Sequence, residues 1–110
     1  MNRFLLFLTF FGFIYTINLN AAAYKGQMVY AKHCVECHGK QVYIQSKTMA
    51  QWKEVFKNKG EDLAQIHLKS QKAEPSWEYF KSKKYTKKVK HLKDFLVEYA
   101  QDSGKVPTCN

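Results

Sequence analysis

Apolar residues recur at helical spacing along most of the chain. The clearest stripe lies between Thr86 and about Gln101 and consists of Val89, Leu92, Leu96 and Tyr99, with Phe95 beside it. No stretch shows the sustained alternation of apolar and polar residues that is typical of a half-buried strand. The pattern therefore predicts an all-α fold that ends in one long amphipathic helix.

Four shorter helical segments are expected before that helix. They are, in order, residues 25–36, a helix from Thr48 to near Gly60, a short helix carrying Leu63, Ile66 and His67, and a piece, "PSWEYF", that opens at Pro75. Thr48 and Gln51 match the capping-box pattern that begins many helices, and a glycine such as Gly60 commonly follows a last turn.

The first 23 residues differ from the rest. Arg3 is followed by an apolar run from Phe4 to about Leu19 and then by three alanines, residues 21–23. A short basic end, an apolar stretch and small residues are typical of a secretory signal peptide. We therefore expect residues 1–23 to be a signal peptide and residues 24–110 to form one exported domain. Retention as an N-terminal anchor is the alternative, because the apolar run is near the lower limit for a span.

The composition is strongly basic for a single small domain. The 110 residues carry 18 Lys and Arg against 9 Asp and Glu, a net charge of +9, and only Arg3 of these lies in the first 23 residues. Such a charge would suit nucleic acid, but export argues against that partner. A polar domain of this size closes only a modest core, so an apolar prosthetic group at its centre would add much to it.

The chemistry concentrates in the stretch "HCVECHGK", residues 33–40. A thioredoxin-type dithiol would need a strand before Cys34, and a structural zinc site would need four ligands, whereas no second cysteine pair follows. The run from Cys34 to His38 also matches C-x-x-C-H, the attachment signature of c-type haem. We therefore predict one covalent haem c. Cys34 and Cys37, one helical turn apart, would bind its vinyl groups, and His38 would bind the iron.

Together these features resemble the small bacterial monohaem class I cytochromes c. In that family an N-terminal helix leads into C-x-x-C-H and a C-terminal helix crosses it. Here Gly26 and Tyr30 stand where the family often has a glycine and an aromatic residue. The resemblance implies a small all-α, cytochrome c-like domain in the periplasm, wrapped around one covalent haem, with its N- and C-terminal helices packed together.

The chain departs from the family at the sixth iron ligand. The family usually supplies a methionine far downstream of the attachment histidine, but no methionine follows Met49. His67 is our preferred candidate, because it lies on the apolar side of a short helix and leaves room for the chain to pass around the haem. Met49 and His91 are the alternatives, together with an open coordination position. Met28 and His33 are less favoured, because they precede the motif. A methionine ligand would raise the haem potential relative to a second histidine.

The predicted function is electron transfer by the haem iron, with no substrate transformed and hence no enzyme activity. The expected partners are acidic redox proteins or membrane-bound respiratory complexes such as a terminal oxidase or a quinol oxidoreductase. Any contact of this protein with the membrane itself is expected to be peripheral. A haem-based sensor or small-ligand binder, with an open or displaceable sixth site, is the alternative function.

Three further features of the sequence carry expectations: a run of lysines, a set of aromatic residues and a cysteine near the C-terminus. Residues 81–93 hold seven lysines, a charge of one sign that would speed encounter with an acidic partner and lose effect with salt; a merely solvated face is the alternative. These are Lys81, Lys83, Lys84, Lys87, Lys88, Lys90 and Lys93.

The aromatic residues expected to form the pocket wall and the core are Trp52, Phe56, Trp77, Phe80 and Tyr85. Cys109 is an odd thiol, either free or paired with another molecule.

Overall fold

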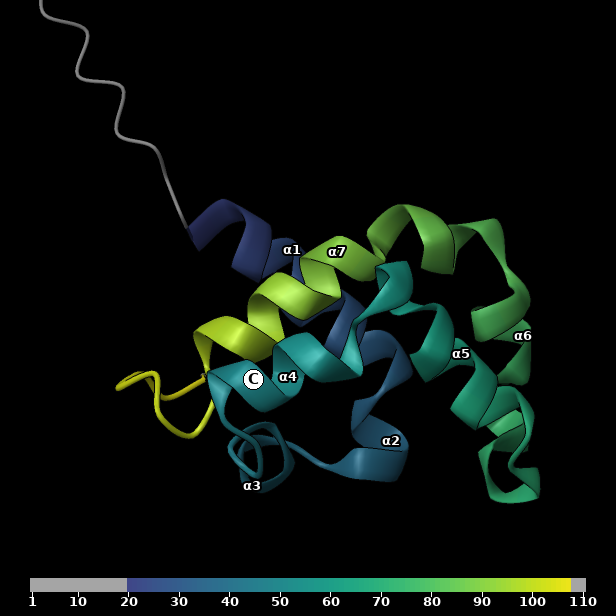
Figure 1. The fold of residues 1–110 in the computed structure, drawn as a ribbon, viewed down its shortest axis with the longest axis horizontal. Helices are drawn as coiled ribbons and strands as arrows, with labels where there is room; N and C mark the ends of the chain where they lie inside the picture. Colours follow the sequence, from purple (N-terminus) through teal and green to yellow (C-terminus); the bar gives the residue numbers. More distant parts are fainter. Residues whose placement is uncertain (1–19, 108–110) are drawn as a thin grey trace, which may run out of the picture.

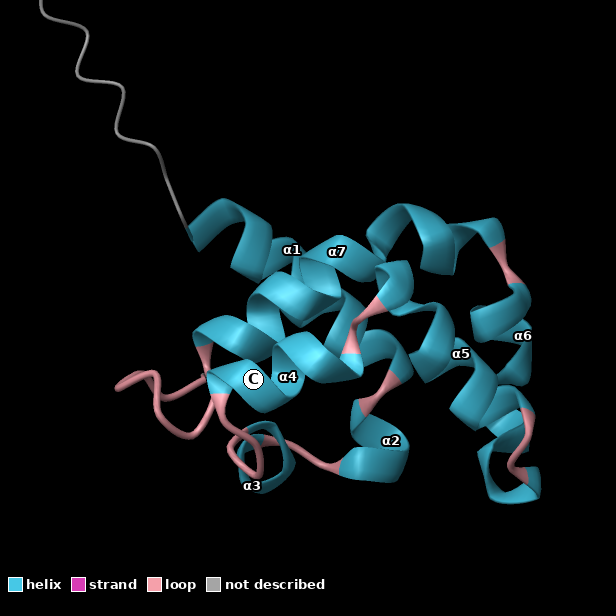
Figure 2. Ribbon diagram, in the orientation of Figure 1, coloured by secondary structure: helices cyan, strands magenta, loops and turns pink. Residues whose placement is uncertain are grey.

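The computed structural model describes residues 20–107, and each of its regular elements is a helix (Figure 1). Figure 2 shows the helices joined by short loops, with no strand in the described part of the chain. The expected all-α class is therefore confirmed. The signal-peptide prediction falls mostly outside the described residues, and the prediction for Cys109 falls wholly outside them, so both stay predictions.

The two helices at the ends of the described chain pack side by side. They are α1 (Asn20–His33) and α7 (Lys83–Glu98) (Figure 1). They touch at Gly26, where an added Cβ would overlap the carbonyl oxygen of His91 and lie 2.6 Å from the Cβ of Phe95. Only glycine allows two backbones to approach so closely. The expected packing of the first helix against the last is therefore present.

The stripe predicted on the last helix faces the core. Val89, Leu92, Phe95 and Leu96 are buried, whereas Tyr99 is half-buried. Tyr85, which was not part of the predicted stripe, is also buried. The predicted bounds, Thr86 to about Gln101, were shifted toward the C-terminus. The helix begins at Lys83, because the hydroxyl of Ser82 accepts a hydrogen bond from the backbone N–H of Tyr85 and caps the first turn.

The helix predicted over residues 25–36 is divided in the structure. Helix α1 starts earlier, at Asn20, and ends at His33, and a short helix α2 (Val35–His38) follows. The break is slight, because the N–H of Cys34 still donates to the carbonyl oxygen of Tyr30 at 2.9 Å. Gly39, with φ of 80°, then ends the helical path.

A short helix that the sequence pattern did not predict, α3 (Gln41–Ile44), precedes α4 (Met49–Val55). The predicted capping box is confirmed: the N–H of Gln51 donates to Thr48 Oγ1 at 3.2 Å, and the N–H of Thr48 donates to Gln51 Oε1 at 2.9 Å. The indole Nε1 of Trp52 donates to the carbonyl oxygen of Ile44 at 2.9 Å, inside the core. This bond ties α3 to α4.

The expectation that the second helix continues to near Gly60 was wrong. Helix α4 ends at Val55, and a 3-10 turn, η1 (Asn58–Gly60), leads into α5 (Glu61–Leu68). Asn58, Lys59 and Gly60 all have positive φ, between 54° and 79°. Gly60 therefore stands at the start of α5, where the hydroxyl of the buried Tyr85 donates to its carbonyl oxygen.

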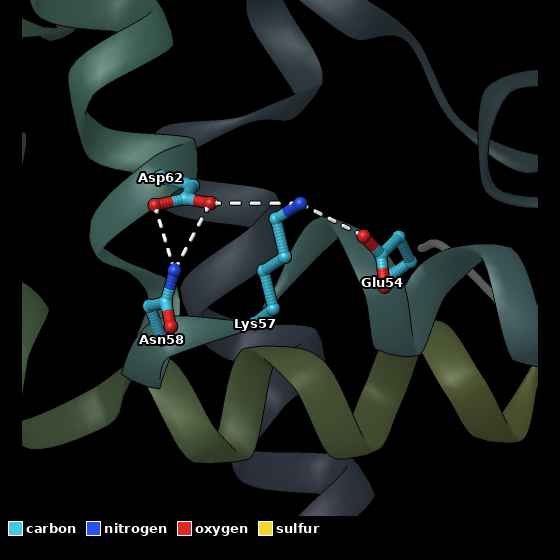
Figure 3. Close-up of polar contacts among 4 residues, drawn as sticks. All are labelled: Glu54, Lys57, Asn58 and Asp62. Carbon is cyan, nitrogen blue, oxygen red and sulfur yellow. Dashed lines mark hydrogen bonds and ion pairs between the residues drawn. The ribbon is translucent and has the colours of Figure 1, made fainter.

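Side chains on both sides of this turn hold it in place (Figure 3). Asn58 Nδ2 donates to both carboxylate oxygens of Asp62, at 3.1 and 3.2 Å. Lys57 Nζ lies 2.8 Å from Glu54 Oε1 and 3.8 Å from Asp62 Oδ2. These exposed contacts contribute little stability individually. Together they favour the change of direction that sets the course of α5.

The chain returns to α7 through η2 (Gln71–Ser76) and α6 (Trp77–Lys81). Pro75 lies inside the 3-10 turn η2 and does not open a helix, which corrects the predicted start of this piece. The indole Nε1 of Trp77 donates to the carbonyl oxygens of His67, at 2.7 Å, and Ser70, at 3.2 Å. Within residues 20–107, no helix combines the length and apolarity that crossing a membrane requires.

Candidate functional site

A cavity of about 410 Å³ opens between the helices. This volume lies within the range of roughly 300–1,000 Å³ that is usual for ligand pockets. The wall is mainly aromatic and aliphatic, and its apolar part consists of Tyr30, Tyr43, Trp52, Phe56, Leu63, Ile66, Phe80, Leu92 and Leu96. The cavity can therefore receive a large apolar group.

All three residues of the attachment motif line this cavity. Cys34 is half-buried and Cys37 is exposed, and both are free thiols. The N–H of His38 donates to the carbonyl oxygen of Cys34 at 3.0 Å, so one helical turn spans the motif. The two cysteines and the histidine thus border the same space, as the predicted haem attachment requires.

The acidity of Cys34 argues against a redox dithiol. Burial, reinforced by the nearby Cys37, raises the pKa of Cys34 to about 12. Catalytic dithiols show the opposite shift, because the thiolate is their nucleophile. No strand precedes Cys34 in the described part of the chain, which also departs from the thioredoxin arrangement.

The imidazole of His38 is held by an aromatic neighbour, and its surroundings favour the neutral form. Its ring stacks on Tyr43, with centres 4.3 Å apart and planes 17° from parallel. Burial, and then the charge of His67, lower the pKa of His38. A ligand histidine must be neutral, so this shift favours the state in which a ring nitrogen is free to bind.

His67 is the second histidine that the fold brings to this point. Its Nδ1 lies 2.7 Å from the carbonyl oxygen of Leu63, one turn earlier on α5, and its ring stacks on Phe80 at 4.2 Å. A backbone carbonyl beside Nδ1 favours the tautomer with hydrogen on that atom, which leaves the lone pair of Nε2 free to bind a metal ion. Ligand histidines in proteins are commonly oriented in this way.

The spacing of the two rings fits one metal ion between them. A metal–imidazole bond is about 2 Å long and the ring centre lies about 1 Å behind its nitrogen, so two rings opposed across one ion have centres roughly 6 Å apart. The centres of His38 and His67 are 6.0 Å apart, with the ring planes inclined at 81°. The pair thus has the separation of two axial ligands.

No group of three or more His, Cys, Asp or Glu side chains in the described residues is placed to hold a metal ion. A haem differs from a bare ion, because the porphyrin supplies the in-plane ligands and the chain supplies only axial ones. Two histidines are therefore a sufficient number of protein ligands for haem iron.

The other candidates for the sixth ligand lie elsewhere. Met49 is half-buried against the core at the first turn of α4, where its N–H donates to Asp102 Oδ1 at 2.8 Å. His91 lies on α7 at the crossing with α1, with a buried Nδ1 that has no hydrogen-bond partner among the described residues. Neither side chain lines the cavity. The fold brings His67 to His38, and iron ligation itself stays a prediction.

The aromatic residues predicted to form the pocket divide into two groups. Trp52, Phe56 and Phe80 line the cavity. Trp77 instead supports the end of α5, and Tyr85 is buried in the core beside Gly60. Helical periodicity identifies inward-facing residues but does not separate those that line the cavity from those that fill the core.

Sequence reasoning missed Tyr43 and gave little weight to His33, although both line the cavity. Tyr43 lies on the unpredicted helix α3, so no signal pointed to it. His33 stacks on Tyr79 with ring centres 3.7 Å apart and planes 9° from parallel. Burial, Lys32 and then Lys84 lower the pKa of His33. Its position directly before the motif was the one available hint.

The lysines of residues 81–93 lie on the surface. All are exposed except Lys93, which is half-buried, and none of them forms an ion pair with a described residue. The charge of Lys84 acts on His33, which lines the cavity, so at least this part of the run lies near the rim.

A comparison of the chain with protein-family models, with curated proteins and with solved structures finds no match.

Proposed function

We propose that this chain is an exported monohaem electron carrier of the cytochrome c type. The observation that carries the proposal is the pair His38 and His67, whose ring centres are 6.0 Å apart in a cavity that both cysteines also line. The close contact of α1 with α7 at Gly26 adds support, since the resemblance implies a crossing of the first and last helices.

Each residue of the site has a separate task. The thiols of Cys34 and Cys37 would hold the haem covalently through its two vinyl groups, each thiol adding across one double bond with no leaving group. His38, from the motif, and His67, from α5, would be the protein ligands of the iron. When bound, the haem supplies one-electron transfer between Fe(III) and Fe(II). The apolar wall keeps water from the iron and tunes its potential.

The firm support of His67 favours an electron carrier over a sensor. Its ring is held by Leu63 and Phe80, and Trp77 fixes the backbone carbonyl of the same residue. A sensor needs a sixth ligand that leaves easily. A carrier needs ligands that stay in place in both oxidation states.

The surface charge supports acidic partners in the periplasm. Exposed lysines on α7 approach the cavity rim at Lys84, and Lys72 lines the cavity itself. Positive charge close to a haem would steer an acidic redox protein, or the acidic face of a membrane-bound respiratory complex, toward the iron.

One experiment tests the haem proposal directly. The full chain is produced in a bacterium with c-type haem attachment machinery, and its intact mass is measured after acid–acetone extraction. We expect the cleaved chain plus one haem that the extraction does not remove. A matched control, Cys34→Ala with Cys37→Ala, should carry no covalent haem and lose most helical circular dichroism, because the core is built around the group. A haem-free wild-type protein with full helical structure would rule out the proposal.

The visible spectrum distinguishes the two candidate functions. A carrier with two histidine ligands should be low-spin in both oxidation states and should bind carbon monoxide slowly or not at all. Rapid binding of carbon monoxide to the reduced wild-type protein would favour the sensor.

A further inference from the structure

The wall of the main cavity is uneven in polarity. Apart from its histidines, Lys72 is the one charged residue that lines it, and the serines of the lining are Ser70 and Ser76. All three fall within residues 70–76, which consist of η2 and Ser70, the residue before it. The rest of the wall is aromatic, aliphatic or part of the cysteine motif. One rim of the cavity is therefore polar and cationic.

This rim is well ordered. The carbonyl oxygen of Ser70 accepts a hydrogen bond from Trp77 Nε1 at 3.2 Å, and Ser76 Oγ donates to the carbonyl oxygen of Ala73 at 2.7 Å. Glu74, the acid in this segment, accepts from Gln71 Nε2 at 3.1 Å. Lys72 is exposed and forms no ion pair with a described residue. Its ammonium group is thus available to an anion at the cavity mouth.

A haem places its acidic and its vinyl groups on different edges. The vinyl edge belongs with Cys34 and Cys37, so the two propionates must leave the cavity at another rim. A carboxylate in an apolar wall without a partner is costly, and a cation beside it removes much of that cost. Figure 1 shows the segment between α5 and α6, which contains the rim, apart from α2, which carries Cys37.

We propose that residues 70–76 form the carboxylate-binding rim of this cavity, in which Lys72 pairs with one haem propionate and the hydroxyl of Ser70 donates to it. This inference rests on the proposed function, because it takes haem as the occupant. It adds a positioning role for Lys72, which fixes the orientation of the porphyrin and places a positive charge close to the iron.

The test compares two lysine variants of the haem-loaded full chain. Lys72→Gln removes the charge at the rim, and Lys69→Gln removes a charge three residues away that is exposed and does not line the cavity. The midpoint potential of each is measured at one pH. Without Lys72 the propionate loses its counter-charge, and its negative charge then favours ferric iron. The midpoint potential should therefore fall in Lys72→Gln by at least roughly twice the fall seen in Lys69→Gln. Lys72→Arg should restore most of the wild-type value.

A second readout does not depend on the potential. The carboxylate bands in the oxidised-minus-reduced infrared spectrum should shift in Lys72→Gln and in Ser70→Ala, but not in Lys69→Gln. Equal potential changes in the two lysine variants, with unchanged carboxylate bands, would overturn the inference. If Lys72→Gln does not accumulate, Ser70→Ala decides, and wild-type carboxylate bands in that variant overturn the inference. Absence of haem in the wild-type chain, seen by intact mass, would instead refute the proposed function.

Discussion

Single side chains decide what the proposed iron site could do, and His67 is the clearest case. Its ring is oriented by Leu63 and by Phe80, so that one ring nitrogen remains for a metal ion. Met49 and His91, which the sequence also offered, have other tasks in the fold, at the first turn of α4 and at the helix crossing. Their different surroundings make the ligand assignment open to direct test.

We expect His67→Ala to convert a low-spin haem into a five-coordinate or water-ligated form. The reason is that the ring centre of His67 lies 6.0 Å from that of His38, whereas Met49 and His91 do not line the cavity. Visible spectra of both oxidation states, and the rate of carbon monoxide binding to the reduced protein, measure the change. Met49→Leu and His91→Ala serve as matched controls and should remain low-spin. A low-spin His67→Ala together with a high-spin Met49→Leu would make the methionine the ligand.

The indole of Trp77 acts on the same site from one step further away. Trp77→Phe keeps an aromatic ring but removes the N–H that donates to the carbonyl oxygens of His67 and Ser70. Loss of one such bond costs about 1 kcal/mol, so the protein should stay folded. We expect ligation by His67 to become labile, seen as faster carbon monoxide binding and a high-spin fraction that grows on warming. Binding at the wild-type rate would show that the bond does not support the ligand.

At the level of helices, the contact between α1 and α7 holds the framework that carries the motif. Helix α1 leads directly into Cys34, and α7 supplies Leu92 and Leu96 to the cavity wall. The contact depends on Gly26, because any side chain there would meet the backbone of His91.

Gly26→Ala should therefore force the two helices apart. Overpacking of this kind typically costs about 1–3 kcal/mol, and we expect the upper end, because the obstacle is backbone and cannot rotate away. Urea unfolding of the haem-loaded protein, followed by circular dichroism, measures the loss. Gly39→Ala is the matched control: an added Cβ meets nothing within 4 Å, and its cost comes from the positive φ alone. A smaller loss for Gly26→Ala than for Gly39→Ala would contradict the account of the crossing.

For the molecule as a whole, the main electrostatic feature is the excess of positive charge. The net charge is +9, and the lysines of residues 81–93 form no ion pair within the described chain. The interaction energy between two exposed charges falls off over a distance of about 10 Å at 0.1 M salt. Only those lysines that lie near a bound partner can therefore matter to its affinity.

Electron exchange with an acidic redox protein should slow markedly as ionic strength rises past physiological values. Changing Lys83, Lys84, Lys87 and Lys88 to glutamine should lower the association rate and flatten the dependence on salt, while the haem spectrum stays the same. Stopped-flow measurement of the exchange rate at several salt concentrations provides the check. A control that replaces Lys53 and Lys59, two exposed lysines outside the run, should change the rate less. An unchanged rate for the fourfold variant at low salt would assign the run to solubility alone.

The sequence by itself determined the features that depend on neighbours along the chain. Helical periodicity gave the all-α class and the inward stripe of α7, because side chains three and four residues apart lie on one face whatever the tertiary fold. The capping box at Thr48 was predictable for the same reason, since its partner is Gln51. The attachment motif is local as well, because one helical turn joins Cys34 to Cys37.

Only the tertiary structure decided which residues meet across the chain. The course of α5 depends on three consecutive left-handed residues, two of which, Asn58 and Lys59, are not glycine, and no sequence pattern predicts that conformation. The fold brings His67 to His38, whereas Trp77, Tyr85, Met49 and His91 do not line the cavity. The pairing of the two histidines arises from long-range packing, and a spacing in sequence cannot specify a distance in space.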